Sequence, residues 1–384
     1  MKKVLSLVLV LSALVSFLYA KQESPAGLKG NSTTTAKPYC AKGLYVSYWA
    51  IGGPKSREKI LNLIDTTEIN SVVIDIKSEF GYIAYKGDVP LAKELGAYTR
   101  RTIRDIDSLM YELKKRGVYT IARIVVFKDD LLAKKHPEYS IFTKKGQYVS
   151  DKEKLAWTNP FVEKVHDYNI EIAKDAVLKG FDEVNFDYIR FPASTSLVFN
   201  VENNETTRVN AITGFLKKAN KVLKPLNAQI SIDTYGYTCW NEGDTGIGQN
   251  LEELVKYADI ISPMLYPSGF QYGIPNYKNP VENSYQTINH SLEKAYKRTN
   301  IDKARFRPWL QAFRDYGFDK RKFNGKEIRT QIDAAEDFGS CGWLLWHPSS
   351  YFIADGLMPE KTTSVAQKEK KMELNQILPL TKKQ

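Results

Sequence analysis

Histidine and cysteine are scarce in this sequence, which holds 4 His and 3 Cys among its 384 residues. The histidines form no His-x-x-x-His pair, and no Cys-His set has the spacing of a zinc site. An all-oxygen Mg²⁺ or Ca²⁺ site made of Asp75, Asp187 and Asp233 is an open alternative, but no loop signature supports it. We therefore expect neither a metal ion nor another cofactor.

Motifs for acyl transfer, nucleotides and nucleic acids are also missing. There is no Gly-x-Ser-x-Gly elbow, and Gly52-Gly53-Pro54 is not a phosphate-binding turn, because proline has no N–H to offer. The formal net charge is +11, but part of this excess lies at the two ends of the chain. No Lys/Arg stripe interleaved with aromatics indicates nucleic acid. The modest basic excess favours a loose association with an anionic envelope.

Only one long apolar run is present, near the N-terminus. It covers residues 4–18, follows Lys2-Lys3 and ends in Leu18-Tyr19-Ala20. This order is typical of a signal peptide over residues 1–20 with cleavage near Ala20. The run is short for a membrane span, so an uncleaved anchor is the less favoured alternative. We expect an exported protein, either periplasmic or secreted.

The composition divides the rest of the chain into three parts. Residues 21–39 are polar and indicate a disordered lead-in, residues 40–358 carry regular patterns, and residues 359–384 are charged, as in a flexible tail. No internal repeat is evident. The patterned part is long for one ordinary domain but normal for one α/β barrel.

Strand-like and helical segments alternate along residues 40–358. Strict alternation predicts parallel strands with right-handed crossovers. Eight such units favour an α/β fold of the (β/α)₈ type, a single-domain TIM barrel, over an open doubly wound sheet. The expected strands cover residues 43–50, 71–77, 118–127, 180–192, 229–235, 259–266, 306–313 and 342–347. The main expected helices begin near Ser56 and Asn159 or cover residues 102–116, 205–223, 281–298 and 326–338.

The cysteines suggest how such a barrel is closed. Cys40 precedes the first expected strand and Cys341 opens the last, and these two strands are neighbours in a closed barrel. Export would place the protein in an oxidising compartment. We therefore hypothesise a Cys40–Cys341 disulfide, with Cys239 at the opposite end of the barrel as the odd cysteine.

Residues 180–192, Gly-Phe-Asp-Glu-Val-Asn-Phe-Asp-Tyr-Ile-Arg-Phe-Pro, carry the clearest functional signal. Their alternation indicates a strand with Asn185 and Asp187 on one face. Asp187 is near the C-terminal end of this strand, where such barrels place their chemistry. A buried acid is costly unless it is paired or has a function. We interpret Asp187 as a catalytic carboxylate; an acid that caps the next loop or pairs with Arg190 is the alternative.

Polar and aromatic side chains also end the other expected strands. Asp233 ends the fifth, beside the fourth, so Asp187 and Asp233 can flank one glycosidic bond as nucleophile or base and as general acid. Repulsion between close carboxylates raises one pKa, as a general acid requires. For Asp75 a structural ion pair with Lys77 or Arg123 is favoured over catalysis. The expected substrate-binding residues are Asp75, Lys77, Glu79, Arg123, Arg190, Tyr235, Trp157, Trp240, Tyr266, Gln311 and His347.

The connection over residues 128–158 is too long for a plain turn, and long loops on a compact fold are usually functional. Trp157 in this loop, together with Trp240 and Trp49, is a candidate stacking platform for sugars. Trp49 fits a core position as well, and His347 fits a structural role equally well.

The stretch at residues 180–192 closely resembles the hallmark of a bacterial family of glycosyl hydrolase domains. The resemblance covers about residues 42–355 and implies a TIM barrel distantly similar to the α-amylase clan. In that clan the nucleophile Asp ends the fourth strand and the general acid ends the fifth, which match Asp187 and Asp233. Two departures stand out: the clan's acid is usually Glu, and the clan has Arg where this chain has Asn185. The other matching segments are residues 42–46, 73–77, 136–138, 157–160 and 231–233.

Together these observations predict an exported glycoside hydrolase whose substrate is an envelope or extracellular polysaccharide or an oligosaccharide. The alternative is a non-catalytic carbohydrate-binding or scaffold barrel, and a lyase or transglycosylase on the same site is a third reading.

Overall fold

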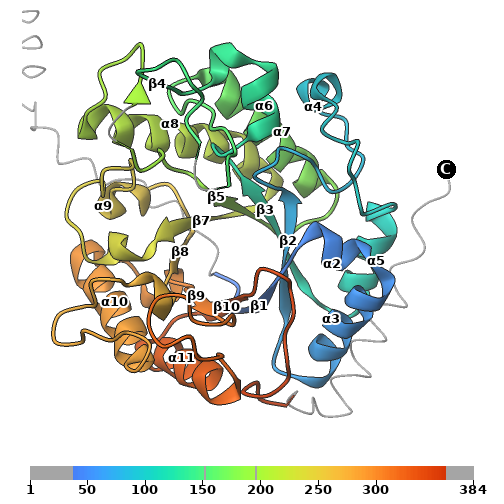
Figure 1. Cartoon of the computed structure of the whole chain (residues 1–384). Helices are drawn as coiled ribbons and strands as arrows, with labels where there is room; N and C mark the ends of the chain where they lie inside the picture. Colours follow the sequence, from blue (N-terminus) through green and yellow to red (C-terminus); the bar gives the residue numbers. More distant parts are fainter. Residues whose placement is uncertain (1–37, 151–152, 195–196, 360–384) are drawn as a thin grey trace, which may run out of the picture. The chain divides into compact units, whose positions relative to one another are not determined.

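The computed structural model describes residues 38–150, 153–194 and 197–359. Within them eight strands close into a barrel in the order β1-β10-β9-β8-β7-β5-β3-β2, and helices surround it (Figure 1). This confirms the predicted (β/α)₈ barrel. The expected signal peptide, most of the lead-in and nearly all of the tail lie outside the described residues.

The barrel strands are short and mostly buried on both faces, because helices cover their outer side. All 7 residues of β2 are buried. A small inner cluster that includes Tyr45, Val73, Ile121 and Trp309 joins several strands. The barrel strands are β1 (Ala41–Val46), β2 (Ser71–Lys77), β3 (Tyr119–Val125), β5 (Glu183–Asp187), β7 (Gln229–Tyr235), β8 (Ile260–Met264), β9 (Trp309–Gln311) and β10 (Gly342–Trp346).

The helices between the strands bury apolar stripes. In α5 the buried residues are Ile106, Leu109, Met110 and Leu113, which have the spacing of one helix face. The helices are α2 (Tyr48–Gly52), α3 (Pro54–Thr66), α4 (Pro90–Leu95), α5 (Ile106–Lys115), α6 (Asp130–Lys135), α7 (Glu163–Leu178), α8 (Glu205–Leu223), α9 (Leu251–Leu254), α10 (Ser284–Thr299) and α11 (Gly325–Phe338).

Several strands are shorter than their sequence patterns predict, and three of them have an evident bearing on the site. The first was expected to reach Ala50 but ends at Val46, because the Ser47 side chain caps α2 by accepting the Ala50 N–H at 3.3 Å. The fourth ends at Asp187 instead of continuing to residue 192. The seventh shrinks from residues 306–313 to β9, which has 3 residues.

A disulfide joins Cys40 to Cys341 at the seam between β1 and β10, with the two Cα atoms 4.3 Å apart. Gly342 follows directly and has a φ of 92°. A Cβ atom at this position would overlap the backbone of Ala41, so the close approach of the first and last strands requires glycine. Cys239 is buried and free.

A second, two-stranded sheet lies outside the barrel, and the sequence patterns did not predict it. Strands β4 (Phe142–Thr143) and β6 (Leu197–Val198) pair antiparallel. Because β4 follows β3 and β6 follows β5, this sheet connects the two long loops that lie over neighbouring barrel strands.

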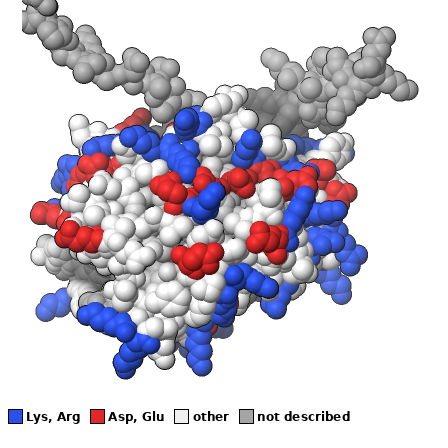
Figure 2. All heavy atoms as spheres, turned by 90° about the horizontal axis from the view of Figure 1, so that it is seen from above, with Lys and Arg blue, Asp and Glu red and all other residues white. Residues whose placement is uncertain are grey.

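Charged side chains of both signs are scattered over the face shown in Figure 2. On the face shown in Figure 2, Lys and Arg residues are interspersed with Asp and Glu residues, and neither sign forms one continuous patch. In the part of the chain that the structure describes, no helix has the length and apolar character that crossing a bilayer requires.

Candidate active site

A cavity of about 250 Å³ lies at the C-terminal ends of the barrel strands, the end at which such barrels carry out chemistry. Side chains from six strands or from the loops directly after them line it. These residues are Arg123, Asp187, Tyr188, Arg190, Asp233, Met264, Tyr266, Trp309 and Trp346.

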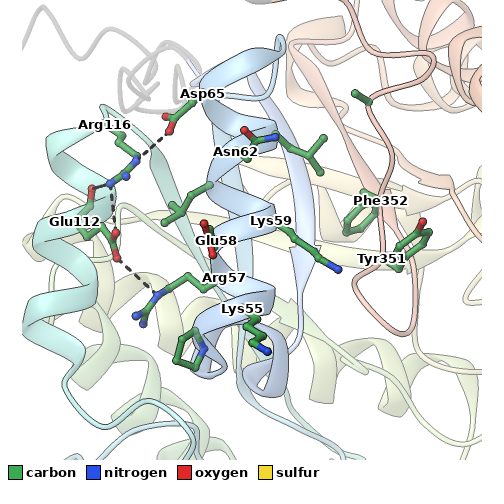
Figure 3. A pocket seen from close by; sticks show the side chains of 14 residues that line it. Lys55, Arg57, Glu58, Lys59, Asn62, Asp65, Glu112, Arg116, Tyr351 and Phe352 are labelled. Carbon is green, nitrogen blue, oxygen red and sulfur yellow. Dashed lines mark hydrogen bonds and ion pairs between the residues drawn. The ribbon is translucent and has the colours of Figure 1, made fainter.

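A larger hollow of about 1080 Å³ lies on the outer surface beside α3 (Figure 3). Two of its acids form surface ion pairs, Glu112 with Arg57 at 3.7 Å and Asp65 with Arg116 at 3.5 Å. None of the acids that line it is buried, whereas the smaller cavity contains two buried carboxylates. Desolvated acids in a cleft indicate chemistry, so the smaller cavity is the candidate active site.

The backbone turns sharply directly after Asp187. Tyr188 has a left-handed conformation with a φ of 49°, which costs a non-glycine residue roughly 1–3 kcal/mol. This turn lets the Tyr188 N–H donate to Oδ1 of Asp187 at 2.6 Å. Backbone strain of this kind gathers at functional sites, and here it fixes the carboxylate in the cavity.

Arg123, from β3, binds two carboxylates at once. Its Nε and Nη2 donate to Oδ2 of Asp187 at 3.0 and 2.5 Å, and its Nη1 donates to Oδ1 of Asp75 at 2.6 Å. The ring centroids of Tyr45 and Trp346 lie 5.5 and 5.0 Å from the guanidinium carbon, within cation–π range. The guanidinium is therefore held from several sides.

Asp233 lies beside Asp187 on the adjacent strand β7. The register pairs Asn185 with Ser231, so the two acids stand at the same level of the barrel. Oδ1 of Asp233 accepts hydrogen bonds from Asn185 Nδ2 at 2.8 Å and from Trp309 Nε1 at 2.7 Å. Both bonds go to the same oxygen, which leaves Oδ2 to carry a proton.

The departure from the α-amylase pattern at Asn185 has a structural counterpart. The guanidinium next to Asp187 comes from Arg123 on the neighbouring strand β3, while the Asn185 amide turns to Asp233. The positive charge is thus supplied from a different strand and is not lost from the cavity.

The acids of the cavity differ in their electrostatic surroundings. Burial, and after it the negative charge of Asp187, raise the pKa of Asp233 well above its ordinary value. Burial raises the pKa of Asp75 to about 6, although Arg123 opposes this shift. Burial alone would lower the pKa of Arg123, but the adjacent carboxylates raise it. A proton is therefore held more strongly on Asp233 than on an ordinary aspartate, in a cavity that Arg123 also lines.

The structure brings several sequence-predicted residues together. Asp75 accepts hydrogen bonds from Arg123 and from the Tyr45 hydroxyl. It thus forms the structural ion pair that the sequence favoured. The charge of Glu79 contributes to raising the pKa of both Asp75 and Arg123. Tyr235 stands at the edge of the site and is 41% exposed. Those that line the cavity itself are Arg123, Asp187, Arg190, Asp233 and Tyr266.

Lys77 does not reach the cavity. A bulge between Asp75 and Lys77 shifts the register against β3 and turns the lysine away. Its Nζ lies 2.7 Å from Oδ2 of Asp129 and donates to the Val125 carbonyl at 2.6 Å. The sequence patterns could not show this bulge, so the prediction that Lys77 binds sugar is corrected to a buried ion pair.

Gln311 and His347 also stay outside the cavity lining. The Gln311 Nε2 donates to Ser268 Oγ at 2.7 Å and its Oε1 accepts the Ser268 N–H at 3.1 Å. His347 Nδ1 accepts the Ser349 N–H at 3.2 Å in the turn after β10, and burial lowers its pKa. Both side chains stabilise loops and do not line the site.

The three tryptophans expected as stacking platforms lie in different surroundings. Trp157 is buried, and the guanidinium of Arg190 lies 4.9 Å from its ring centroid, so it supports a cavity residue from behind. The Trp240 indole N–H donates to Ser291 Oγ at 2.8 Å and thus faces α10. Trp49 is 62% exposed on α2, which excludes the core position.

Several lining residues were not expected from the sequence: Tyr188, Met264, Trp309 and Trp346. Trp309 and Trp346 meet edge to face, with ring centroids 5.5 Å apart. A tryptophan in a strand-like segment is usually interpreted as a core residue, so the polar Gln311 was predicted as the substrate-binding residue of this strand instead. Trp346 ends β10, and this position is the signal that could have found it, whereas Trp309 begins β9 and gave no such signal.

No metal site is evident in the described part of the chain, where no group of three or more His, Cys, Asp or Glu side chains could hold an ion. Asp75 and Asp187 direct oxygens to the N–H groups of Arg123, and Asp233 directs one to Asn185.

Residues 43–352 match the family described as "Putative glycosyl hydrolase domain". The fold and the cavity therefore define a class, the barrel-type glycosyl hydrolase domains. This chain belongs to that family, as the stretch at residues 180–192 indicated.

Solved structures share the barrel. The PgaB (BpsB) glycoside hydrolase domain from Bordetella bronchiseptica is 14% identical with a TM-score of 0.59, over 82% of this chain and 95% of that chain. Alpha-L-fucosidase isoenzyme 2 from Paenibacillus thiaminolyticus is 12% identical with a TM-score of 0.51, over 81% and 47%. At these identities both show the fold alone. A hypothetical protein from Ruminiclostridium thermocellum ATCC 27405 is 35% identical with a TM-score of 0.45, over 49% and 96%. No curated protein matches the chain.

Proposed function

We propose that this protein is an exported glycoside hydrolase that cleaves an envelope or extracellular polysaccharide, with Asp187 as nucleophile or base and Asp233 as general acid. The observation that carries the proposal is the contrast between two neighbouring carboxylates in one cavity. Asp187 accepts hydrogen bonds from the Arg123 guanidinium, whereas burial and Asp187 raise the pKa of Asp233.

This contrast matches the division of labour in glycoside hydrolysis. One carboxyl group protonates the leaving oxygen, and the other attacks the sugar or activates water. Asp233 can donate a proton from Oδ2 because its Oδ1 is fixed by Asn185 and Trp309. Asp187 is held by the strained turn at Tyr188. Donors placed before the reaction reduce the reorganisation that it needs.

Export is supported by two independent features. The sequence begins with the charged and apolar pattern of a signal peptide. The Cys40–Cys341 disulfide is a feature of proteins in oxidising compartments. Both fit a substrate outside the cytoplasm.

Release of reducing ends from a panel of envelope polysaccharides tests the proposal. We expect turnover by the wild type on at least one of them, and Asp187→Asn should lose turnover while it still binds that polysaccharide. A matched control is Asp107→Asn, because the Asp107 side chain is 77% exposed on α5 and should leave activity unchanged. Full activity in Asp187→Asn would contradict the assignment.

One observation favours a second candidate, a carbohydrate-binding barrel without turnover. Both hydrogen bonds that Arg123 gives to Asp187 go to a single carboxylate oxygen, and so firm an ion pair lowers the reactivity of a nucleophile. Such a protein would bind a polysaccharide of the panel, and neither the wild type nor any variant would release reducing ends.

A further inference from the structure

Four tyrosines gather beside the cavity at β7 and in the loops after β7, β8 and β9, and we name them the tyrosine rim: Tyr235, Tyr237, Tyr272 and Tyr316. The exposed fractions of Tyr235, Tyr272 and Tyr316 are 41%, 91% and 53%. The Tyr237 ring centroid lies 5.8 Å from that of Tyr235 and 6.3 Å from that of Tyr272. Exposed aromatic rings in one group mark a surface for a partner or a ligand.

The tyrosine rim is continuous with the cavity. Tyr266 lines the cavity, and its ring centroid lies 5.4 Å from that of Phe313, which stacks on Tyr316 at 6.1 Å. The cavity residue Arg190 lies near Tyr235 on the other side of the tyrosine rim. Burial raises the pKa of Tyr235, and the positive charge of Arg190 partly opposes this rise. Burial and then Tyr235 raise the pKa of Tyr316, so the two sides are neighbours.

Hydrogen bonds fix the loop that carries Tyr272. The Tyr237 hydroxyl donates to the Gly273 carbonyl at 3.2 Å and accepts the Tyr272 N–H at 3.0 Å. One tyrosine of the rim therefore positions another, and ordering of this loop does not have to accompany ligand binding.

Asp315 fixes the turn that carries Tyr316. Its carboxylate accepts three backbone N–H groups within residues 317–320, at 2.8 to 2.9 Å. Ser268 Oγ donates to Asp315 at 2.6 Å, and Gln311 donates to Ser268 Oγ at 2.7 Å. The Gln311 side chain, expected from the sequence to contact substrate, is thus an indirect support of the tyrosine rim.

The size of the cavity limits what it can enclose. Its volume of about 250 Å³ is below the roughly 300–1,000 Å³ of pockets that enclose a drug-sized ligand. It therefore accommodates about one sugar ring, and the neighbouring units of a chain must lie outside. Tyrosine offers such units a flat apolar face and a polar edge.

We infer that the tyrosine rim binds the sugar units that adjoin the one in the cavity, so the ligand of this site is a polysaccharide chain and not a disaccharide. The inference rests on the proposed function for the carbohydrate nature of the ligand. It adds a binding surface and a minimum chain length that the two carboxylates alone do not imply.

Binding of glycans of graded length tests this inference without turnover. The probe is the envelope polysaccharide fraction of the organism that carries the protein, partly hydrolysed by acid, fractionated by length and end-labelled with a fluorophore. Fluorescence polarisation is measured with the full chain carrying Asp187→Asn. We expect long fragments to bind about ten-fold or more tightly than disaccharides, a difference of about 1.4 kcal/mol.

Adding Tyr272→Ala and Tyr316→Ala should remove this length preference, and Tyr272→Phe with Tyr316→Phe should restore it, because the rings bind and not the hydroxyls. Tyr111→Ala is the matched control, since Tyr111 is 71% exposed on α5 and should keep the preference. A length preference that survives loss of both rings, or no binding of any fragment, overturns the inference. Ring-dependent binding without reducing-end release by the wild type would refute the hydrolase and leave the rim in place.

Discussion

Arg123 determines the charge balance at the residue scale. It is buried together with Asp75 and Asp187, and its guanidinium donates to both carboxylates. Removing one partner of such a buried set leaves an uncompensated charge, which is more costly than the pair itself. The third acid, Asp233, accepts its hydrogen bonds from neutral donors, the Asn185 amide and the Trp309 indole.

The raised pKa of Asp233 predicts a pH profile. Burial and Asp187 raise its pKa, so the acid form persists to higher pH, and kcat/KM should fall as the pH rises past that raised value. Asp233→Asn should reduce kcat on the polysaccharide by about 10²–10⁴-fold. The same variant should recover on aryl glycosides with a good leaving group, which need no protonation. An equal loss on both substrate types would contradict the role of general acid.

Asp75 predicts a pH-dependent stability. Folding raises its pKa from 3.8 to about 6, so its contribution to the free energy of unfolding is present below about pH 4 and lost as the pH rises through about 6. The shift corresponds to on the order of 3 kcal/mol. Asp75→Asn should flatten this dependence in urea unfolding across the window. Asp107→Asn should keep the wild-type slope; an unchanged slope in Asp75→Asn would refute the prediction.

At the element scale, strand ends and the loops after them carry the site. The alternation in residues 180–192 and 229–235 was enough to direct Asp187 and Asp233 to one cavity, because a strand has a period of two. The same rule failed for Lys77, because a bulge interrupts β2. It failed for Gln311, because β9 is only 3 residues long. The Gln311 side chain instead forms hydrogen bonds with Ser268 in the loop after β8.

Contacts between elements were beyond the sequence patterns. Nothing in β3 alone shows that Arg123 would reach Asp187 on β5, or that Trp309 on β9 would donate to Asp233 on β7. Such bonds depend on side-chain rotamers across the barrel interior. Patterns along one strand do not encode them, although they predicted the order and direction of the strands.

The hydrogen bonds of Asp315 in the turn after β9 predict how stability and glycan binding depend on this residue. Hydrogen bonds from Ser268 and backbone N–H groups lower the pKa of Asp315 to about 2 despite its burial, so its support is present above about pH 4 and lost as the pH falls towards 2. Asp315→Ala should cost about 1–3 kcal/mol of stability and weaken binding of long glycan fragments. Asp319→Ala, which removes the ion pair with Arg321 and one hydrogen bond from its backbone N–H, leaves every bond of Asp315 in place and should change neither. Unaltered fragment binding in Asp315→Ala would show that Tyr316 does not need this support.

At the scale of the whole molecule, one covalent bond crosses the seam where β1 pairs with β10 and closes the barrel. Cys40 and Cys341 are 301 residues apart in sequence, and linking distant positions restricts the unfolded chain strongly. Loss of the bond through Cys341→Ser should lower the free energy of unfolding by about 2–5 kcal/mol. Thermal unfolding with and without a reductant checks this. The reductant should not affect the Cys40→Ser/Cys341→Ser variant, and an equally stable Cys341→Ser variant would contradict the prediction.

The position of this bond has a consequence for biosynthesis. The thiol of Cys40, near the start of the domain, can meet its partner only after almost the entire domain has been synthesised, so the disulfide forms only in a complete domain. A chain interrupted anywhere before residue 341 would lack the partner of Cys40 and leave that thiol free for exchange with other disulfides. Complete molecules thus carry a disulfide at the seam of the barrel, whereas fragments carry a free Cys40 thiol there.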